Sequence, residues 1–111
     1  MAIIRKYLTK NNYTKADNNI LNNKHLSDQA KLLYWFIASH KNAFQLNDGF
    51  IVDGLNWSRA KVTRYKTELQ KWGFILVDKI DRSTYFMYVG SSEKSAEQVK
   101  KEWSELEKIK D

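Results

Sequence analysis

Cationic and hydroxylated side chains are concentrated on one segment, between Ser58 and Gly73. Its large apolar residues recur at steps of three, four and three, the spacing of one stripe along an α-helix: Val62, Tyr65, Leu69 and Trp72. Ser58 suits the N-cap of this helix, and Gly73 suits the left-handed residue that ends it. The opposite face and its flanks carry the side chains that could contact a nucleic acid: Ser58, Arg59, Ala60, Lys61, Thr63, Arg64, Lys66, Thr67 and Lys71.

These residue types match the contacts that a helix makes in the major groove of DNA. Arg64 can donate paired hydrogen bonds to guanine, and Ala60 and Thr63 can touch thymine methyl groups. Thr67 suits a base or a phosphate. Phosphates can bind at the first helical turn, at Ser58, and to the ammonium groups of Lys61, Lys66 and Lys71. The sequence therefore predicts a DNA-contacting helix, and the alternative is an ordinary solvated basic face.

The segments before this helix predict the rest of a helix-turn-helix. A first helix begins after Ser27, and its apolar surface extends almost all round, which is typical of a central buried helix. A short helix is expected over residues 48–55, with Asn47 or Asp48 as its cap, followed by a tight turn at 56–57. In a helix-turn-helix, the second of two such helices enters the major groove.

Two other basic segments are candidate DNA contacts. Two β-prone runs at 74–80 and 85–89 predict a hairpin, or wing, whose turn offers Lys79, Arg82, Ser83 and Thr84; Asp78 and Asp81 are interpreted as turn residues. Residues 1–12 are expected to form a short strand or a basic arm, with Arg5, Lys6 and Lys10 placed for the minor groove or a phosphate. The alternatives are a solvated turn and a frayed N-terminus.

A charged amphipathic helix is expected over residues 91–111, with Ser92 as its cap. Ala96 begins its apolar stripe, which continues with Val99, Trp103 and Leu106 at heptad-like spacing. Two interpretations of the stripe stay open. It packs on the chain's own domain, or it forms the interface of a homodimer.

The expected fold class is α+β, mostly α: a winged helix-turn-helix domain over residues 13–90, with three helices, a two- or three-stranded wing sheet and the additional C-terminal helix. The net charge of the chain is +6. Residues 1–92 hold 14 Lys and Arg against 7 Asp and Glu, whereas residues 93–111 hold 5 against 6. The basic excess lies in the expected domain, where it favours a polyanionic partner.

Composition argues against several other classes of protein. Cysteine is absent, and no run approaches the roughly 18 apolar residues of a membrane span, so we expect a cytoplasmic protein without a membrane partner. The only histidines are His25, before the first helix, and His40, where a cation would suit the end of that helix. Without a nucleophile–base pair, a metal-ligand cluster or a phosphate loop, we expect no enzyme activity, cofactor, metal or small-molecule substrate.

The stretch from Leu26 to Tyr34, LSDQAKLLY, resembles the LS-x-x-AK-x-L motif of a family of winged-helix domains from Gram-positive phages and plasmids. That family comprises replication initiators, replisome organisers and regulators. The preceding residues 18–21 resemble its N-x-x-L, and residues 62–75 resemble its closing V-x5-E-L-x3-G-[YF]-[IL], with Glu68 as the acidic residue. The chain departs from the pattern at Lys66, where an apolar residue is usual, and in its glycine-rich second helix. The resemblance implies a winged helix and DNA binding.

The function expected from these patterns is double-stranded DNA binding in the cytoplasm of a bacterium. The protein would act as a sequence-specific regulator of a plasmid or phage, or as an accessory factor at a replication or transfer origin. The alternative is a winged-helix module that binds proteins and not DNA, with the stripe of the last helix as its surface.

Overall fold

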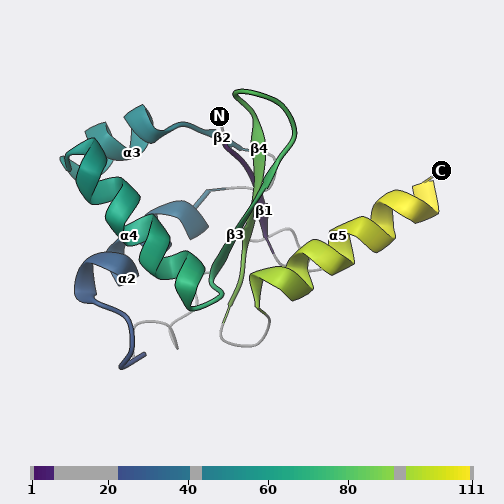
Figure 1. Cartoon of the computed structure of the whole chain (residues 1–111), viewed down its shortest axis with the longest axis horizontal. Helices are drawn as coiled ribbons and strands as arrows, with labels where there is room; N and C mark the ends of the chain where they lie inside the picture. The colour runs from purple at the N-terminus through teal and green to yellow at the C-terminus, as the bar shows by residue number, and fades with distance from the viewer. Residues whose placement is uncertain (1, 7–22, 41–43, 92–94, 111) are drawn as a thin grey trace.

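The computed structural model describes residues 2–6, 23–40, 44–91 and 95–110 of the 111-residue chain. Within them the chain forms an α+β structure in which a mixed sheet has helices on both faces (Figure 1). The elements in chain order are β1 (Ala2–Lys6), α2 (Asp28–Ala38), β2 (Gln45–Leu46), α3 (Asp48–Leu55), α4 (Arg59–Lys71), β3 (Ile75–Lys79), β4 (Tyr85–Val89) and α5 (Ala96–Lys110).

The boundaries predicted for α2, α3 and α4 are confirmed, because local capping sets them. Ser27, Asn47 and Ser58 each accept a hydrogen bond from the backbone amide three residues ahead, which satisfies one free donor of the first turn. Asn56 adopts a left-handed conformation with φ of 55° and ends α3, and Gly73 with φ of 80° follows α4. The tight connection sets α3 and α4 side by side.

The sheet is larger than the sequence predicted. The expected hairpin of β3 and β4 is present, with Ile75 opposite Val89. However, β1 lies beside β4 in parallel, with Ala2 opposite Tyr85, and β2 adds a further antiparallel strand on β1, giving the order β2-β1-β4-β3. The expectation of two or three strands is therefore wrong. These pairings join segments far apart in the sequence, and no local signal reports such contacts.

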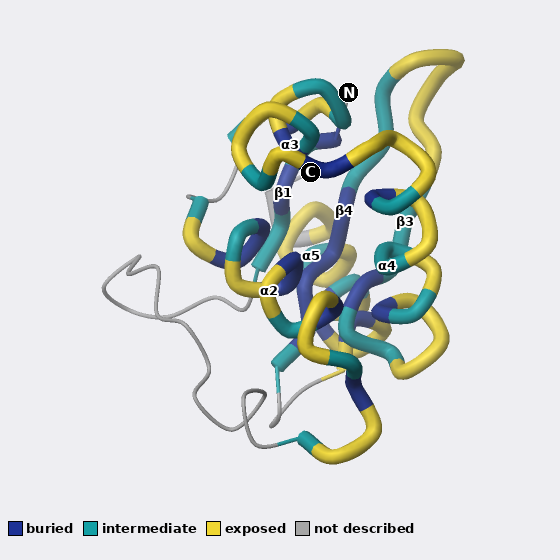
Figure 2. The backbone as a smooth tube through the Cα atoms, turned by 90° about the vertical axis from the view of Figure 1, so that its left-hand side faces the viewer, coloured by how far each residue is buried: buried dark blue, intermediate teal, exposed yellow. Residues whose placement is uncertain are grey.

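Period-two alternation divides the sheet side chains between two apolar layers. Ile4, Ile75 and Met87 are buried on the face covered by the helices from α2 to α4, together with Leu33 and Ile37 of α2. The residues between them turn the other way, where Tyr88 packs with α5. Figure 2 shows the buried stretches of β1 and β4 crossing the middle of the molecule.

Helix α5 covers the second face of the sheet. It begins at Ala96, and the Ser95 hydroxyl accepts a hydrogen bond from the Gln98 amide while the Gln98 side chain accepts one from the Ser95 amide. This reciprocal capping box corrects the predicted cap Ser92, which lies outside the described residues. The exposed C-terminal part of the helix runs away from the sheet (Figure 1).

The carboxylate of Glu68 on α4 joins two helices. Its oxygens accept hydrogen bonds from the amide of Ser27 at 2.8 Å and from the hydroxyl of Ser27 at 3.0 Å. The same hydroxyl oxygen caps α2 by accepting from the Ala30 amide at 3.2 Å. An acid of the basic helix thus holds the N-terminus of α2 against α4.

We expect Glu68→Ala to lower the free energy of unfolding by about 1–3 kcal/mol, because it removes charge-assisted hydrogen bonds that stabilise a helix cap. Urea denaturation followed by circular dichroism measures the change. Glu105→Ala, which removes an exposed acid of α5, is the matched control and should leave the midpoint nearly unchanged. Equal midpoints for the two variants would contradict the role given to Glu68.

Candidate nucleic-acid interface

One face of α4 packs inward, and the other is exposed. Val62 and Leu69 are buried in the core below the helix. At about 100° per residue, the opposite face is the one that the sequence assigned to DNA. Ser58 is exposed at the N-cap, and six more of the predicted contact residues are exposed on this face and its edges: Arg59, Ala60, Thr63, Arg64, Thr67 and Lys71. We call this set the outer face of α4.

The cations around the outer face lie against aromatic rings. The Lys61 ammonium is 4.7 Å from the centre of the Trp57 ring, the Arg64 guanidinium carbon is 5.6 Å from that of Tyr65, and the Lys71 ammonium is 5.5 Å from that of Trp72. Within the described ranges these cations form no ion pair with a carboxylate. Their charges are therefore available to an anionic ligand, on side chains whose stems are supported by packing.

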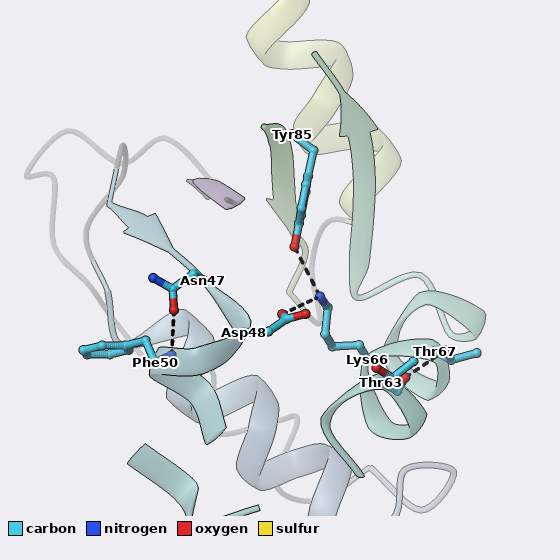
Figure 3. Close-up of polar contacts among 7 residues, drawn as sticks. All are labelled: Asn47, Asp48, Phe50, Thr63, Lys66, Thr67 and Tyr85. Carbon is cyan, nitrogen blue, oxygen red and sulfur yellow. Dashed lines mark hydrogen bonds and ion pairs between the residues drawn. The ribbon is translucent and has the colours of Figure 1, made fainter. Parts of the chain in front are cut away.

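Lys66 is placed differently from the phosphate contact that the sequence predicted. Its side chain is only 15% exposed, and its ammonium lies 3.2 Å from the Asp48 carboxylate and 3.3 Å from the Tyr85 hydroxyl (Figure 3). The lysine therefore joins α3, α4 and β4 and is not part of the outer face. This contact also accounts for a cation at position 66, where the winged-helix motif that the sequence resembles has an apolar residue.

Glu68 is likewise removed from the outer face, because its carboxylate binds Ser27. It is the only acidic residue of α4. The outer face consequently presents cations, hydroxyls and methyl groups without an acidic side chain, and this is the electrostatic character that a phosphate backbone requires.

The hairpin turn at residues 80–84 projects beyond the body of the sheet (Figure 1). Asp81 acts as a turn residue, as predicted: its carboxylate accepts hydrogen bonds from the amides of Ser83 at 2.9 Å and Thr84 at 2.8 Å. These hydrogen bonds lower the pKa of Asp81. They also fix the turn on which Arg82 and Ser83 are exposed, while Thr84 is half-buried and Lys79 is exposed at the end of β3.

The structure places Arg5 and Lys6 away from the outer face. Arg5 lies between the sheet and α5, with its guanidinium carbon 3.4 Å from the centre of the Phe86 ring and a nitrogen 2.7 Å from the Glu107 carboxylate. Lys6 donates a hydrogen bond to the Ala38 carbonyl oxygen at 3.0 Å. Of the two forms expected for this segment, residues 2–6 are a strand; Lys10 lies outside the described residues.

The stripe of α5 packs on the chain's own sheet. Val99 is fully buried and Trp103 is partly buried against the same cluster, where its indole nitrogen donates to the Lys6 carbonyl oxygen at 3.1 Å. Leu106 remains 37% exposed. Two of the three residues proposed for either packing or a homodimer are therefore used in packing.

Two expectations for the region around α2 are wrong. The helix is not buried all round, because Leu32 is 51% exposed and Trp35 is 40% exposed on the described surface. His40 does not favour the charged form: its ring stacks on Phe44 with 4.2 Å between centres, and burial followed by the charge of Lys6 lowers its pKa. The predicted buried surface of α2 was therefore too wide, because Leu32 and Trp35 belong to the surface of the described chain.

Neither a metal-ligand cluster nor a membrane-spanning helix is found among the described residues. They contain no group of three His, Cys, Asp or Glu side chains that could hold a metal ion. None of their helices has both the length and the apolar character needed to cross a membrane.

A comparison with protein-family models, curated proteins and solved structures finds no match to this chain. The function is therefore inferred from the geometry and chemistry of the outer face.

The environment of Lys6 gives a pH dependence of stability. Burial lowers the pKa of Lys6 from 10.5 to about 8. Between these two pH values the unfolded chain holds a proton that the folded chain has released, so the lysine makes the free energy of unfolding rise with pH. Urea denaturation of the wild type and of Lys6→Met at pH 7, 9 and 10.5 should show this rise reduced in the variant. Parallel pH profiles would contradict it.

Proposed function

We propose that this chain is a winged helix-turn-helix protein that binds double-stranded DNA through the outer face of α4. The observation that carries the proposal is the composition of that face: its cations and hydroxyls are exposed, whereas Glu68 and Lys66 of the same helix are engaged inside the protein. The order of α2, α3, α4 and the β3–β4 hairpin supports the fold assignment.

In the proposed complex α4 lies in the major groove, which is wide enough to admit one helix. Arg64 donates to a guanine edge, and Arg59, Lys61 and Lys71 neutralise phosphates on either side of the groove. Helix α3 contacts α4 through the Asp48–Lys66 pair and keeps the insertion angle fixed. The hairpin turn, with Arg82 exposed at its tip, contacts the flanking backbone or minor groove.

For the biological setting we propose a bacterial mobile element, in which the protein is a sequence-specific regulator or an accessory factor at a replication or transfer origin. The support is the resemblance of the LSDQAKLLY segment and of residues 62–75 to winged-helix domains of phages and plasmids. The cytoplasm is the corresponding compartment.

The direct test is fluorescence anisotropy with a random-sequence duplex pool at low ionic strength, followed by selection of the bound sequences. We expect binding that weakens steeply as salt is added. On the selected duplex, Arg64→Ala should weaken binding by about tenfold or more, since a bidentate guanine contact contributes about 1–3 kcal/mol. Lys71→Ala should weaken binding to every sequence and reduce the salt slope by about one.

Lys101→Ala is the matched control, because it removes an exposed cation from α5 on the other face of the sheet. It should leave the dissociation constant nearly unchanged. Absence of duplex binding at low salt, or equal losses from Arg64→Ala and Lys101→Ala, would contradict the proposal.

A second candidate function is binding to another protein, and the exposed apolar side chains of α2 favour it. Leu32 and Trp35 lie side by side at one shallow depression that Asp28 and Lys31 also line. Contiguous exposed apolar surface of this kind marks interaction sites.

The protein-binding candidate predicts that Trp35→Ala abolishes association with a partner protein and leaves duplex binding unchanged. Capture from cell extract with wild type and Trp35→Ala as paired baits measures the first effect, and anisotropy measures the second. Identical captured proteins for the two baits would contradict this candidate.

A further inference from the structure

The hydroxyl group of Thr67 is engaged within its own helix. Thr67 Oγ1 donates a hydrogen bond to the carbonyl oxygen of Thr63, one turn earlier, at 2.9 Å (Figure 3). Its only hydrogen atom is therefore used, although the residue is exposed. The hydroxyl can then only accept a further hydrogen bond, and the methyl group has no partner in the helix.

Two other residues with methyl groups, Ala60 and Thr63, share the outer face of α4 with Thr67. At about 100° per residue, Ala60 and Thr67 differ by about 20° around the helix axis, and Thr63 lies between them along the axis. All three residues are exposed. Seven residues at 1.5 Å per residue separate Ala60 from Thr67 by about 10.5 Å, which matches about three base-pair steps of B-DNA.

We infer that the middle of the outer face reads thymine, with the methyl groups of Ala60, Thr63 and Thr67 packing against the 5-methyl groups of thymines in the major groove. The inference deepens the proposed function and rests on it. The ligand is duplex DNA with thymines opposite these residues and a guanine opposite Arg64, which lies beside them.

Contact between methyl groups discriminates between bases because thymine alone among the four DNA bases carries an apolar group on its major-groove edge. Deoxyuridine keeps the hydrogen-bonding pattern of thymine and lacks only that methyl. Burying one such group contributes about 0.8 kcal/mol, which is about fourfold in affinity.

The test uses the full chain and a duplex selected from a random pool. Each thymine of the site is replaced singly by deoxyuridine, and anisotropy gives the dissociation constant. We expect about fourfold weaker binding at one or more positions inside the site and no change at thymines in the flanking duplex. Equal affinity for every substituted duplex overturns the inference but leaves the proposed function intact, whereas failure to bind any duplex overturns the proposed function itself.

Two variants of Thr67 separate the methyl group from the hydroxyl. Thr67→Val keeps a methyl and removes the hydroxyl, so it should retain both affinity and the deoxyuridine penalty. Thr67→Ser keeps the hydroxyl and removes the methyl, so it should bind about fourfold more weakly and lose the penalty at one position. Circular dichroism of both variants checks that the helix content is unchanged. The opposite pattern, with loss in Thr67→Val alone, would show that the hydroxyl contacts DNA and would overturn the inference.

Discussion

The carboxylate of Glu68 is the interaction on which the arrangement of the helices depends. It accepts two hydrogen bonds from Ser27, and Ser27 in turn caps α2, so one side chain fixes where α2 begins and how α4 lies against it. The same contact directs the only acidic side chain of α4 toward α2, so the opposite side of α4 carries cations and no acid. The same orientation of α4 therefore favours both the stability of the fold and the proposed affinity for DNA.

The sheet divides the basic residues of the chain into structural and accessible ones. Because β1 is an inner strand paired with β2 and β4, Arg5 projects into the layer beneath α5, where the Phe86 ring and the Glu107 carboxylate surround its guanidinium. Lys66 is enclosed by Asp48 and Tyr85 in the same manner. A count of positive residues overstates the surface charge of this protein, and the outer face of α4 is distinguished by cations that no carboxylate of the described chain neutralises.

How much of the structure can be predicted from the sequence depends on the range of the interactions involved. Helix boundaries were predictable because caps such as Ser27, Asn47 and Ser58 act within three residues. The parallel pairing of β1 with β4 was not, since it joins Ala2 to Tyr85 and only the folded chain brings them together. At the candidate site, periodicity predicts which side of α4 is exposed. It does not predict that Lys66 is held inside the protein, because that depends on contacts with Asp48 and Tyr85 from other elements.

The side chains of the outer face differ in what they can contribute, and the difference follows from their partners. A cation such as Lys71 interacts with any phosphate, so its contribution is independent of sequence and sensitive to salt. A hydroxyl that already donates to its own helix, as in Thr67, has no hydrogen left to donate to a base, and its methyl group remains available for apolar contact. Specificity in this surface would then come from a short row of small groups beside Arg64, and affinity from the cations around it. Such a division lets a helix with few base-specific hydrogen bonds distinguish sequences, because a methyl contact and a guanine contact respond to different features of the groove.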